Sequence, residues 1–226
     1  MTQSIAIARQ DMIDSLLTQT NTRRALLVKA GIVGAGATAA MMIPRLTVAQ
    51  DATPMAEDAP FADAIDVLNY ALTLEHLESA FYRDGLAEIG VEGITGLGFQ
   101  PSVFDNLTAI GEHEAAHVTT LTDVITQLGG EPVAEGTYDF GYTDAASFLQ
   151  VSQALEDTGV SAYQGAAQYL IDEDELLTAA LTIHGVEARH AAYVAVLNGG
   201  NPFPEAVNPT LTPAEVLEIA GPFIQS

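Results

Sequence analysis

The sequence predicts an all-α fold: a bundle of four long helices, with a long connection between the second and third and a short helix at the C-terminal end. Four stretches after residue 60 repeat apolar residues with the period of an α-helix, about 3.6 residues. Loops that contain Gly and Pro separate them, and no run shows the alternation of a β-strand. The chain of 226 residues is long enough for one domain with a substantial core.

The first 49 residues have the pattern of an export signal. A twin arginine, Arg23-Arg24, precedes an apolar run from Ala30 to Ile43, and small residues at 47–49 offer a cleavage site. The run is shorter than the roughly 20 residues of a membrane-spanning helix, which disfavours a permanent anchor. We therefore expect export by the twin-arginine route to the periplasm, the cell surface or the extracellular space, without stable membrane insertion after processing. Residues 50–60 would form a linker, and residues 61–226 the folded domain.

The first helix is predicted from Asp63 to Leu86, before a segment with four glycines. The second is predicted to begin at the capping sequence 102–105, after Pro101, and to stop at residues 129–130, both glycine. The connection that follows, residues 129–142, reaches about 46 Å when extended. A helix of this length spans about 39 Å, so the connection can run the length of the bundle and leave the second and third helices parallel.

The third helix is predicted from residues 143–144 to Leu170. The fourth follows the acidic segment 172–175 and ends at residues 198–199. A last, short helix is predicted from Thr212, with proline at its first position.

Each long helix carries a glutamate near the midpoint of its apolar face: Glu75, Glu114, Glu156 and Glu187. They lie 12 to 15 positions after the predicted helix starts, so antiparallel packing places all four in one layer. A histidine follows three positions later on two of these helices, His117 and His190. On the other two, a tyrosine follows seven positions later, Tyr82 and Tyr163. The chain therefore looks like two helical hairpins of one design, each with three ligands.

This layer predicts a dinuclear metal site. The chain has no cysteine, which excludes thiolate zinc sites, iron–sulfur clusters and disulfides and leaves His, Asp and Glu as ligands. The alternative is a network of buried ion pairs, but residues 50–226 contain only two basic residues, both arginine, against 28 acidic ones. Two divalent ions would neutralise four buried carboxylates. We predict two Fe or two Mn ions, with a protonated, metal-poor layer as the alternative.

Several neighbours of the six predicted ligands are ambiguous. Glu78 and His184 each lie three residues from a predicted ligand and are candidates for an extra ligand or an outer partner, the latter favoured for His184. Tyr82 and Tyr163 are candidate catalytic neighbours, expected to be core aromatics that hydrogen-bond to ligand carboxylates. The remaining polar residues near the layer fall off the inward faces and are expected to be solvated: His76, Glu112 and His113.

Four segments of the sequence carry a resemblance to a known family: LNYALTLEHLESAFYRDGL, GEHEAAH, ALEDTGVSAY and GVEARHAAY. They resemble the ferritin-like family that includes desiccation-related and stress-response proteins, within the superfamily of ferritin, bacterioferritin, rubrerythrin and manganese catalase. The resemblance extends from about Phe61 to the C-terminus. It implies a ferritin-like four-helix bundle, and it places the metal ligands of the superfamily on the same six residues.

The ligand set and the resemblance together imply an exported dinuclear Fe or Mn protein that acts on peroxide or oxygen in oxidative or desiccation stress defence. A ferroxidase, a peroxidase and a manganese-catalase-like oxidoreductase all fit. The alternative is a non-enzymatic metal-binding or structural stress protein. Residues 50–226 carry a formal charge of −26, which repels phosphate backbones and disfavours nucleic acid as a partner. The sequence leaves open whether the chain forms a homo-oligomer.

Overall fold

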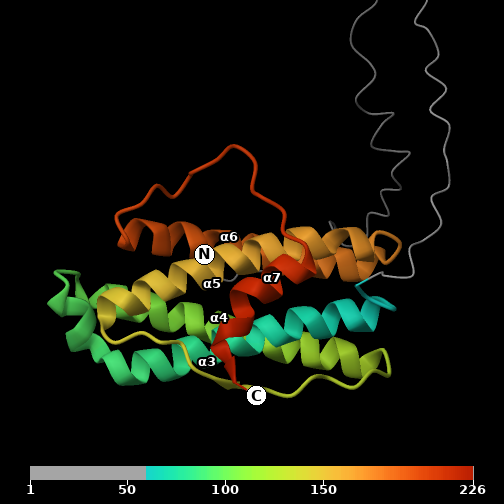
Figure 1. Cartoon of the computed structure of the whole chain (residues 1–226), viewed down its shortest axis with the longest axis horizontal. Coiled ribbons are helices and arrows are strands. Elements are labelled where there is room, and N and C mark those ends of the chain that lie inside the picture. Colours follow the sequence, from blue (N-terminus) through green and yellow to red (C-terminus); the bar gives the residue numbers. More distant parts are fainter. Residues whose placement is uncertain (1–59, 226) are drawn as a thin grey trace, which may run out of the picture. The chain divides into compact units, whose positions relative to one another are not determined.

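The computed structural model describes residues 60–225 (Figure 1). The predicted export signal and all but the last residue of the predicted linker lie outside the described residues. Four long helices form a bundle: α3 (Ala64–Gly96), α4 (Pro101–Gln127), α5 (Ala145–Ala166) and α6 (Asp174–Leu197). The described part also contains the short helix α7 (Pro213–Ala220) and the 3-10 turns η1 (Ala167–Leu170) and η2 (Gly221–Phe223). The predicted all-α helical bundle is confirmed.

Two helical hairpins make up the bundle. α3 packs against α4 and α5 packs against α6, and α3 also contacts α5. α4 and α5 run in the same direction, because the connection 128–144 travels along the bundle between them, as its length predicted (Figure 1). No helix among residues 60–225 is both long and apolar enough to cross a membrane.

Two predicted helix boundaries were wrong. α3 continues past Leu86 to Gly96. Its backbone is kinked at Gly90, where φ is 63°, and the helix resumes after this residue. Ile94 in the resumed segment is fully buried, so tertiary packing stabilises a turn that the glycines alone disfavour. α4 begins at Pro101 with Gln100 as its extended N-cap, and Ser102 lies inside the first turn. A proline forces the preceding residue to be extended and needs no N–H partner itself, so it sets the start.

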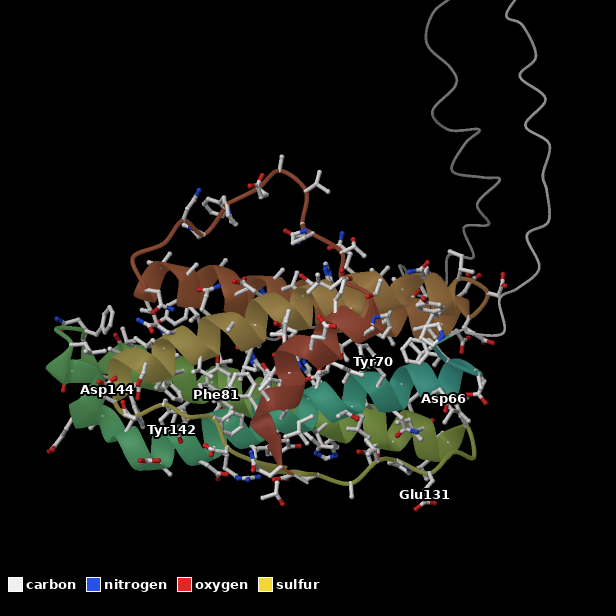
Figure 2. The ribbon with its side chains drawn as sticks, viewed as in Figure 1. Asp66, Tyr70, Phe81, Glu131, Tyr142 and Asp144 are labelled. Atoms are coloured by element: carbon white, nitrogen blue, oxygen red, sulfur yellow. The ribbon has the colours of Figure 1, made fainter. Side chains whose placement is uncertain are left out.

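Aromatic side chains fasten the long connection to the bundle. Phe81 of α3 stacks on Phe148 of α5 with ring centroids 4.6 Å apart, and Phe140 and Tyr142 of the connection pack edge-on against Phe81. In Figure 2, Phe81 and Tyr142 lie toward the end of the bundle where Asp144 precedes α5. Gly85 provides the room, since a Cβ there would lie 2.4 Å from the Phe148 ring.

The C-terminal segment crosses the outside of α5. α7 packs against α5, and beyond it β2 (Ile224–Gln225) pairs antiparallel with β1 (Thr137–Tyr138) of the long connection. The sequence did not predict this two-residue pairing. Before α7, the backbone carbonyl of Leu211 approaches α5 so closely that a Cβ at Gly165 would lie 1.9 Å from it. The absence of a side chain at Gly165 therefore allows the segment to approach α5 this closely.

We expect Gly165→Ala to destabilise the domain by about 1–3 kcal/mol, because the Leu211 backbone has to move away from α5. Gly96→Ala is the matched control, since a Cβ at Gly96 meets no atom within 4 Å and its cost should stay within about 0.5 kcal/mol. Urea unfolding followed by far-UV circular dichroism measures both. Equal stability of the two variants would contradict the packing described for residue 211.

Candidate metal centre

The four long helices bring the six predicted ligands together in one buried layer. The set consists of one residue from α3, two from α4, one from α5 and two from α6: Glu75, Glu114, His117, Glu156, Glu187 and His190. All four glutamates have an exposed fraction of 0%, and the two histidines expose 8% and 5%. Because a buried carboxylate without a partner is costly, the layer requires positive charge or protons.

The six residues divide into two groups that share two members. Glu75, Glu114, His117 and Glu187 form one group, and the second replaces Glu75 and His117 by Glu156 and His190. In each group the donor atoms lie within 4.8 Å of one another. Glu114 and Glu187 therefore lie between the groups. Each group offers three carboxylates and one imidazole, a donor set that suits Fe and Mn and also accommodates Zn.

The surroundings of His117 fit a cation better than a proton. Its Nδ1 lies 3.1 Å from an oxygen of Glu75, of Glu114 and of Glu187. An imidazole nitrogen carries one proton at most, so it cannot satisfy three carboxylates by hydrogen bonding. A cation placed among these oxygens would bind all of them.

The second group contains buried polar atoms that lack a hydrogen-bond partner. They are Glu114 Oε1, Glu156 Oε2, both carboxylate oxygens of Glu187 and His190 Nδ1. His190 Nδ1 nevertheless lies 2.9 Å from Glu114 Oε1 and 3.4 Å from Glu156 Oε2. The atoms are close but not oriented as donor and acceptor. Each buried polar atom without a partner costs about 1–3 kcal/mol, so these residues fit a bound metal ion.

Without a cation, protons occupy the layer. Burial raises the pKa of Glu156 to about 8. Burial alone would also raise the pKa of Glu114, but the nearby imidazoles of His117 and His190 lower it to about 2. For both histidines burial opposes protonation, but the surrounding glutamates outweigh it, raising the pKa of His117 to about 12 and that of His190 to about 10. The metal-free layer thus mixes protonated histidines with protonated and ionised carboxyls.

Two buried tyrosines hold Glu75 and Glu156, each of which belongs to only one of the two groups. Tyr163 donates a hydrogen bond to Glu75 Oε1. Tyr82 donates to Glu156 Oε1 at 2.5 Å, and Ser152 Oγ lies 2.6 Å from the same hydroxyl. These bonds fix the carboxylate orientations. A catalytic role for either tyrosine stays a prediction.

His113 is exposed, as expected, and its ring also contacts a predicted ligand. Its Nδ1 lies 2.9 Å from Nε2 of His190, and the two rings stack with centroids 5.2 Å apart. A partner at Nε2 orients the ring so that the opposite nitrogen, Nδ1, faces the carboxylates. The sequence places His113 beside Glu114 but does not show which residue of α6 faces it.

Glu78 and His184 lie in neither group. Glu78 is buried beside Gly159, where a Cβ would lie 3.0 Å from Glu78 Oε1 and 3.3 Å from Glu187 Oε2, so the glycine makes room for both carboxyls. Burial and the neighbouring carboxylates raise the pKa of Glu78. His184 has a buried Nε2 without a hydrogen-bond partner, and burial lowers its pKa.

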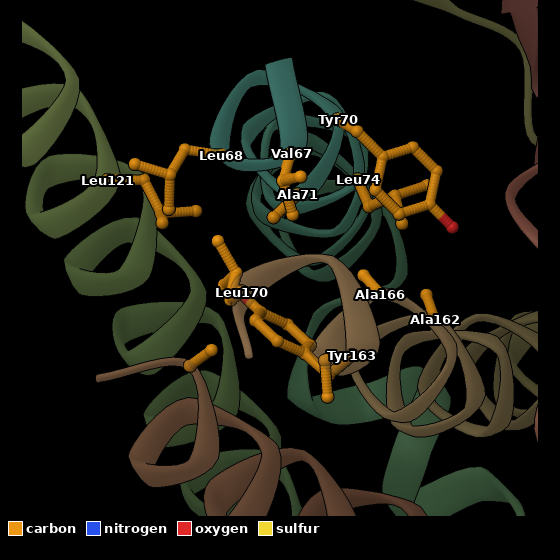
Figure 3. Close-up of a pocket in the computed structure, with 12 residues that line it drawn as sticks. Val67, Leu68, Tyr70, Ala71, Leu74, Leu121, Ala162, Tyr163, Ala166 and Leu170 are labelled. Atoms are coloured by element: carbon orange, nitrogen blue, oxygen red, sulfur yellow. The ribbon is translucent and has the colours of Figure 1, made fainter. Parts of the chain in front are cut away.

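A small apolar cavity borders the site at Tyr163 (Figure 3). Its volume is about 20 Å³, enough for one molecule of the size of water. Its walls come from α3, α4, α5, η1 and α6, and include Val67, Leu68, Ala71 and Leu121. Tyr163, which donates a hydrogen bond to Glu75, therefore also lines this cavity.

Stripped of metal by a chelator, the protein should lose stability as the pH rises from about 4.5 to about 8. The pKa of Glu156 is about 8 in the folded state against an ordinary 4.5, so the folded state binds more protons in this range. Stability therefore falls with rising pH, and the raised histidine pKa values act in the same direction above 6.5. Melting temperatures measured with chelator and with Mn(II) check this, since metal should flatten the slope. A melting temperature that rises toward pH 8 in chelator would show that the carboxyls are not buried together.

Comparison with known proteins agrees with this fold. The family model described as a ferritin-like domain matches residues 63–200, which include all six residues of the layer. No curated protein matches the chain. The resemblance seen in the sequence is thus confirmed at the level of the superfamily. Because the match covers more than half of the 226 residues, the chain belongs to the ferritin-like domain family.

Proposed function

We propose that this protein binds a pair of Fe or Mn ions and uses them to consume peroxide or oxygen, outside the cytoplasm, in defence against oxidative or desiccation stress. One observation carries the proposal: two groups of donor atoms share Glu114 and Glu187. A shared pair of carboxylates suits two ions held close together.

Charge supports two ions rather than one. The layer contains four carboxylates, and neither arginine of the described residues pairs with any of them. Two divalent ions would balance four ionised carboxylates and leave both histidines neutral, which is the form that binds metal. Oxygen-rich ligands with one nitrogen per group favour Fe or Mn.

When bound, such a pair supplies two electrons to an O–O bond, so peroxide with two protons yields two waters. The chain's own residues shield and orient the site. Burial of the six residues excludes bulk water, and Tyr82 and Tyr163 hold Glu156 and Glu75 in place. The cavity beside Tyr163 has room for about one molecule of the size of water.

The source of electrons distinguishes the candidate reactions. Without cysteine the chain has no rubredoxin centre, so a peroxidase needs an external reductant, whereas a catalase cycle needs none. A second candidate function is a structural metal site that only stabilises the bundle. The low exposure of the layer, at most 8% for any of the six residues, favours this alternative.

Export by the twin-arginine route is part of the proposal and is supported by Arg23-Arg24 and the apolar run after them. This route carries folded proteins, which suits a metal loaded before export. Sequencing the N-terminus of the exported chain tests it, since cleavage after residues 47–49 would leave Gln50 first.

Purified protein should contain about two Fe or Mn ions per chain, and Glu114→Ala combined with His117→Ala should remove most of them. Glu114 belongs to both groups, so its loss affects both ions. Elemental analysis by mass spectrometry measures the content. Glu112→Ala, on the exposed side of the same helix, is the control and should keep full occupancy. Full metal content in the double variant would disprove the assignment.

Reduced, metal-loaded protein should consume hydrogen peroxide, and Glu156→Ala should abolish this while leaving the helix content unchanged. Asp157→Ala, an exposed neighbour, is the matched control. Peroxide loss is followed for protein reconstituted with Fe and, separately, with Mn. Turnover without reductant would select the catalase-like reaction, and a single stoichiometric burst with Fe would select ferroxidase or peroxidase chemistry. Full occupancy without consumption of peroxide or oxygen would favour the structural alternative.

A further inference from the structure

After its first turn, which contains Asp174 and Glu175, the outward face of α6 carries no exposed acidic residue. Between Leu176 and Leu197 the Asp, Glu, Lys and Arg residues are Glu187, buried in the layer, and Arg189, which is exposed. The whole chain has a net charge of −23. Two copies of such a chain repel each other wherever acidic residues cover the surface. This repulsion is weak on the α6 face beyond its first turn.

This face is also apolar and open. Leu181 and Val196 each expose 54% of their surface, and a Cβ at Gly185 would meet no atom within 4 Å. The residues that share the face are spaced by three, four or seven positions. From the first turn of the helix to the last they are Asp174, Thr178, Leu181, Gly185, Arg189 and Val196.

Arg189 has no acidic partner among residues 60–225. Its guanidinium donates to the carbonyl of Gly185 on its own helix at 2.7 Å. The other arginine of the described chain, Arg83, is instead paired with Asp84 and Glu135. An exposed cation without a carboxylate, on a chain with such an excess of acid, indicates a partner that supplies one.

We propose that a second copy of this chain binds antiparallel on the α6 face, with the two-fold axis between Leu181 and Thr182. Arg189 and Asp174 lie on opposite sides of this point, each about 11 Å along the helix. A two-fold axis there therefore brings Arg189 of each copy to Asp174 of the other.

The same axis fits the centre of the face. The two Leu181 side chains meet at the axis, and Thr178 of each copy lies opposite Gly185 of the other. The missing side chain at Gly185 allows the helices to approach closely. One face thus supplies an apolar centre and complementary charges at its two ends, which is the requirement for an interface between identical surfaces.

Sedimentation velocity of the full chain over a range of concentrations, in about 0.5 M salt to screen the net repulsion, tests the proposal. The native chain should form a species of twice 23.7 kDa. Arg189→Asp and Asp174→Arg, made separately, should each raise the dimer dissociation constant about tenfold or more, because they place like charges opposite each other. Leu181→Asp should do the same.

The decisive variant carries both charge changes, Asp174→Arg and Arg189→Asp, and should recover the native dimer to within a few-fold. A different acidic partner would not be recovered in this way, because only a second copy carries the exchanged charge. Arg83→Asp, which changes the other arginine of residues 60–225, is the control and should leave the dimer intact. Unchanged helix content by circular dichroism shows that each variant is folded. A monomeric native chain, a dimer unaffected by Arg189→Asp, or a double variant that stays monomeric would overturn the proposal. The test is independent of metal chemistry.

Discussion

The burial of four carboxylates in one layer is the constraint on which the rest of this structure depends. The six residues contribute four potential negative charges at the centre of the bundle, and the two arginines of the described chain lie elsewhere. Protons balance the layer without metal, and divalent ions balance it with metal. Both the stability of the core and its capacity to bind metal therefore depend on how the charge of these carboxylates is neutralised.

The packing around the layer meets this constraint with a few special residues. Three apolar clusters lie along the bundle. One contains Phe81 and Phe148, the second Leu72 and Ile125, and the third Val67, Ala166 and Leu170. Glycine appears where a carboxyl or a tyrosine approaches a backbone: Gly159 accommodates Glu78 and Glu187, and a Cβ at Gly111 would lie 2.8 Å from Tyr82 Cβ. The tyrosine hydroxyls then fix the carboxylates. Rigid surroundings of this kind keep donor atoms at short distances even before a metal binds.

The outside of the bundle follows a different rule. Exposed acidic residues are spread over α3, α4 and the long connection, and this favours solubility over association. After its acidic first turn, α6 departs from that pattern, because the rest of its outward face keeps small and apolar residues with one arginine. The same helix supplies Glu187 and His190 inward. A contact between copies on this face would thus act on the helix that holds two of the six layer residues.

The sequence by itself determined the helices, the parallel course of α4 and α5, and the six residues of the layer. These follow from local rules: apolar periodicity, the length of the 129–142 connection and the position of each glutamate along its helix. Only the tertiary structure decided which groups share Glu114 and Glu187, that His113 reaches His190, and that α3 continues to Gly96. Each of these depends on contacts between residues far apart in the chain, such as the burial of Ile94 or the facing of α4 and α6, and the spacing along one helix carries no information about its neighbour.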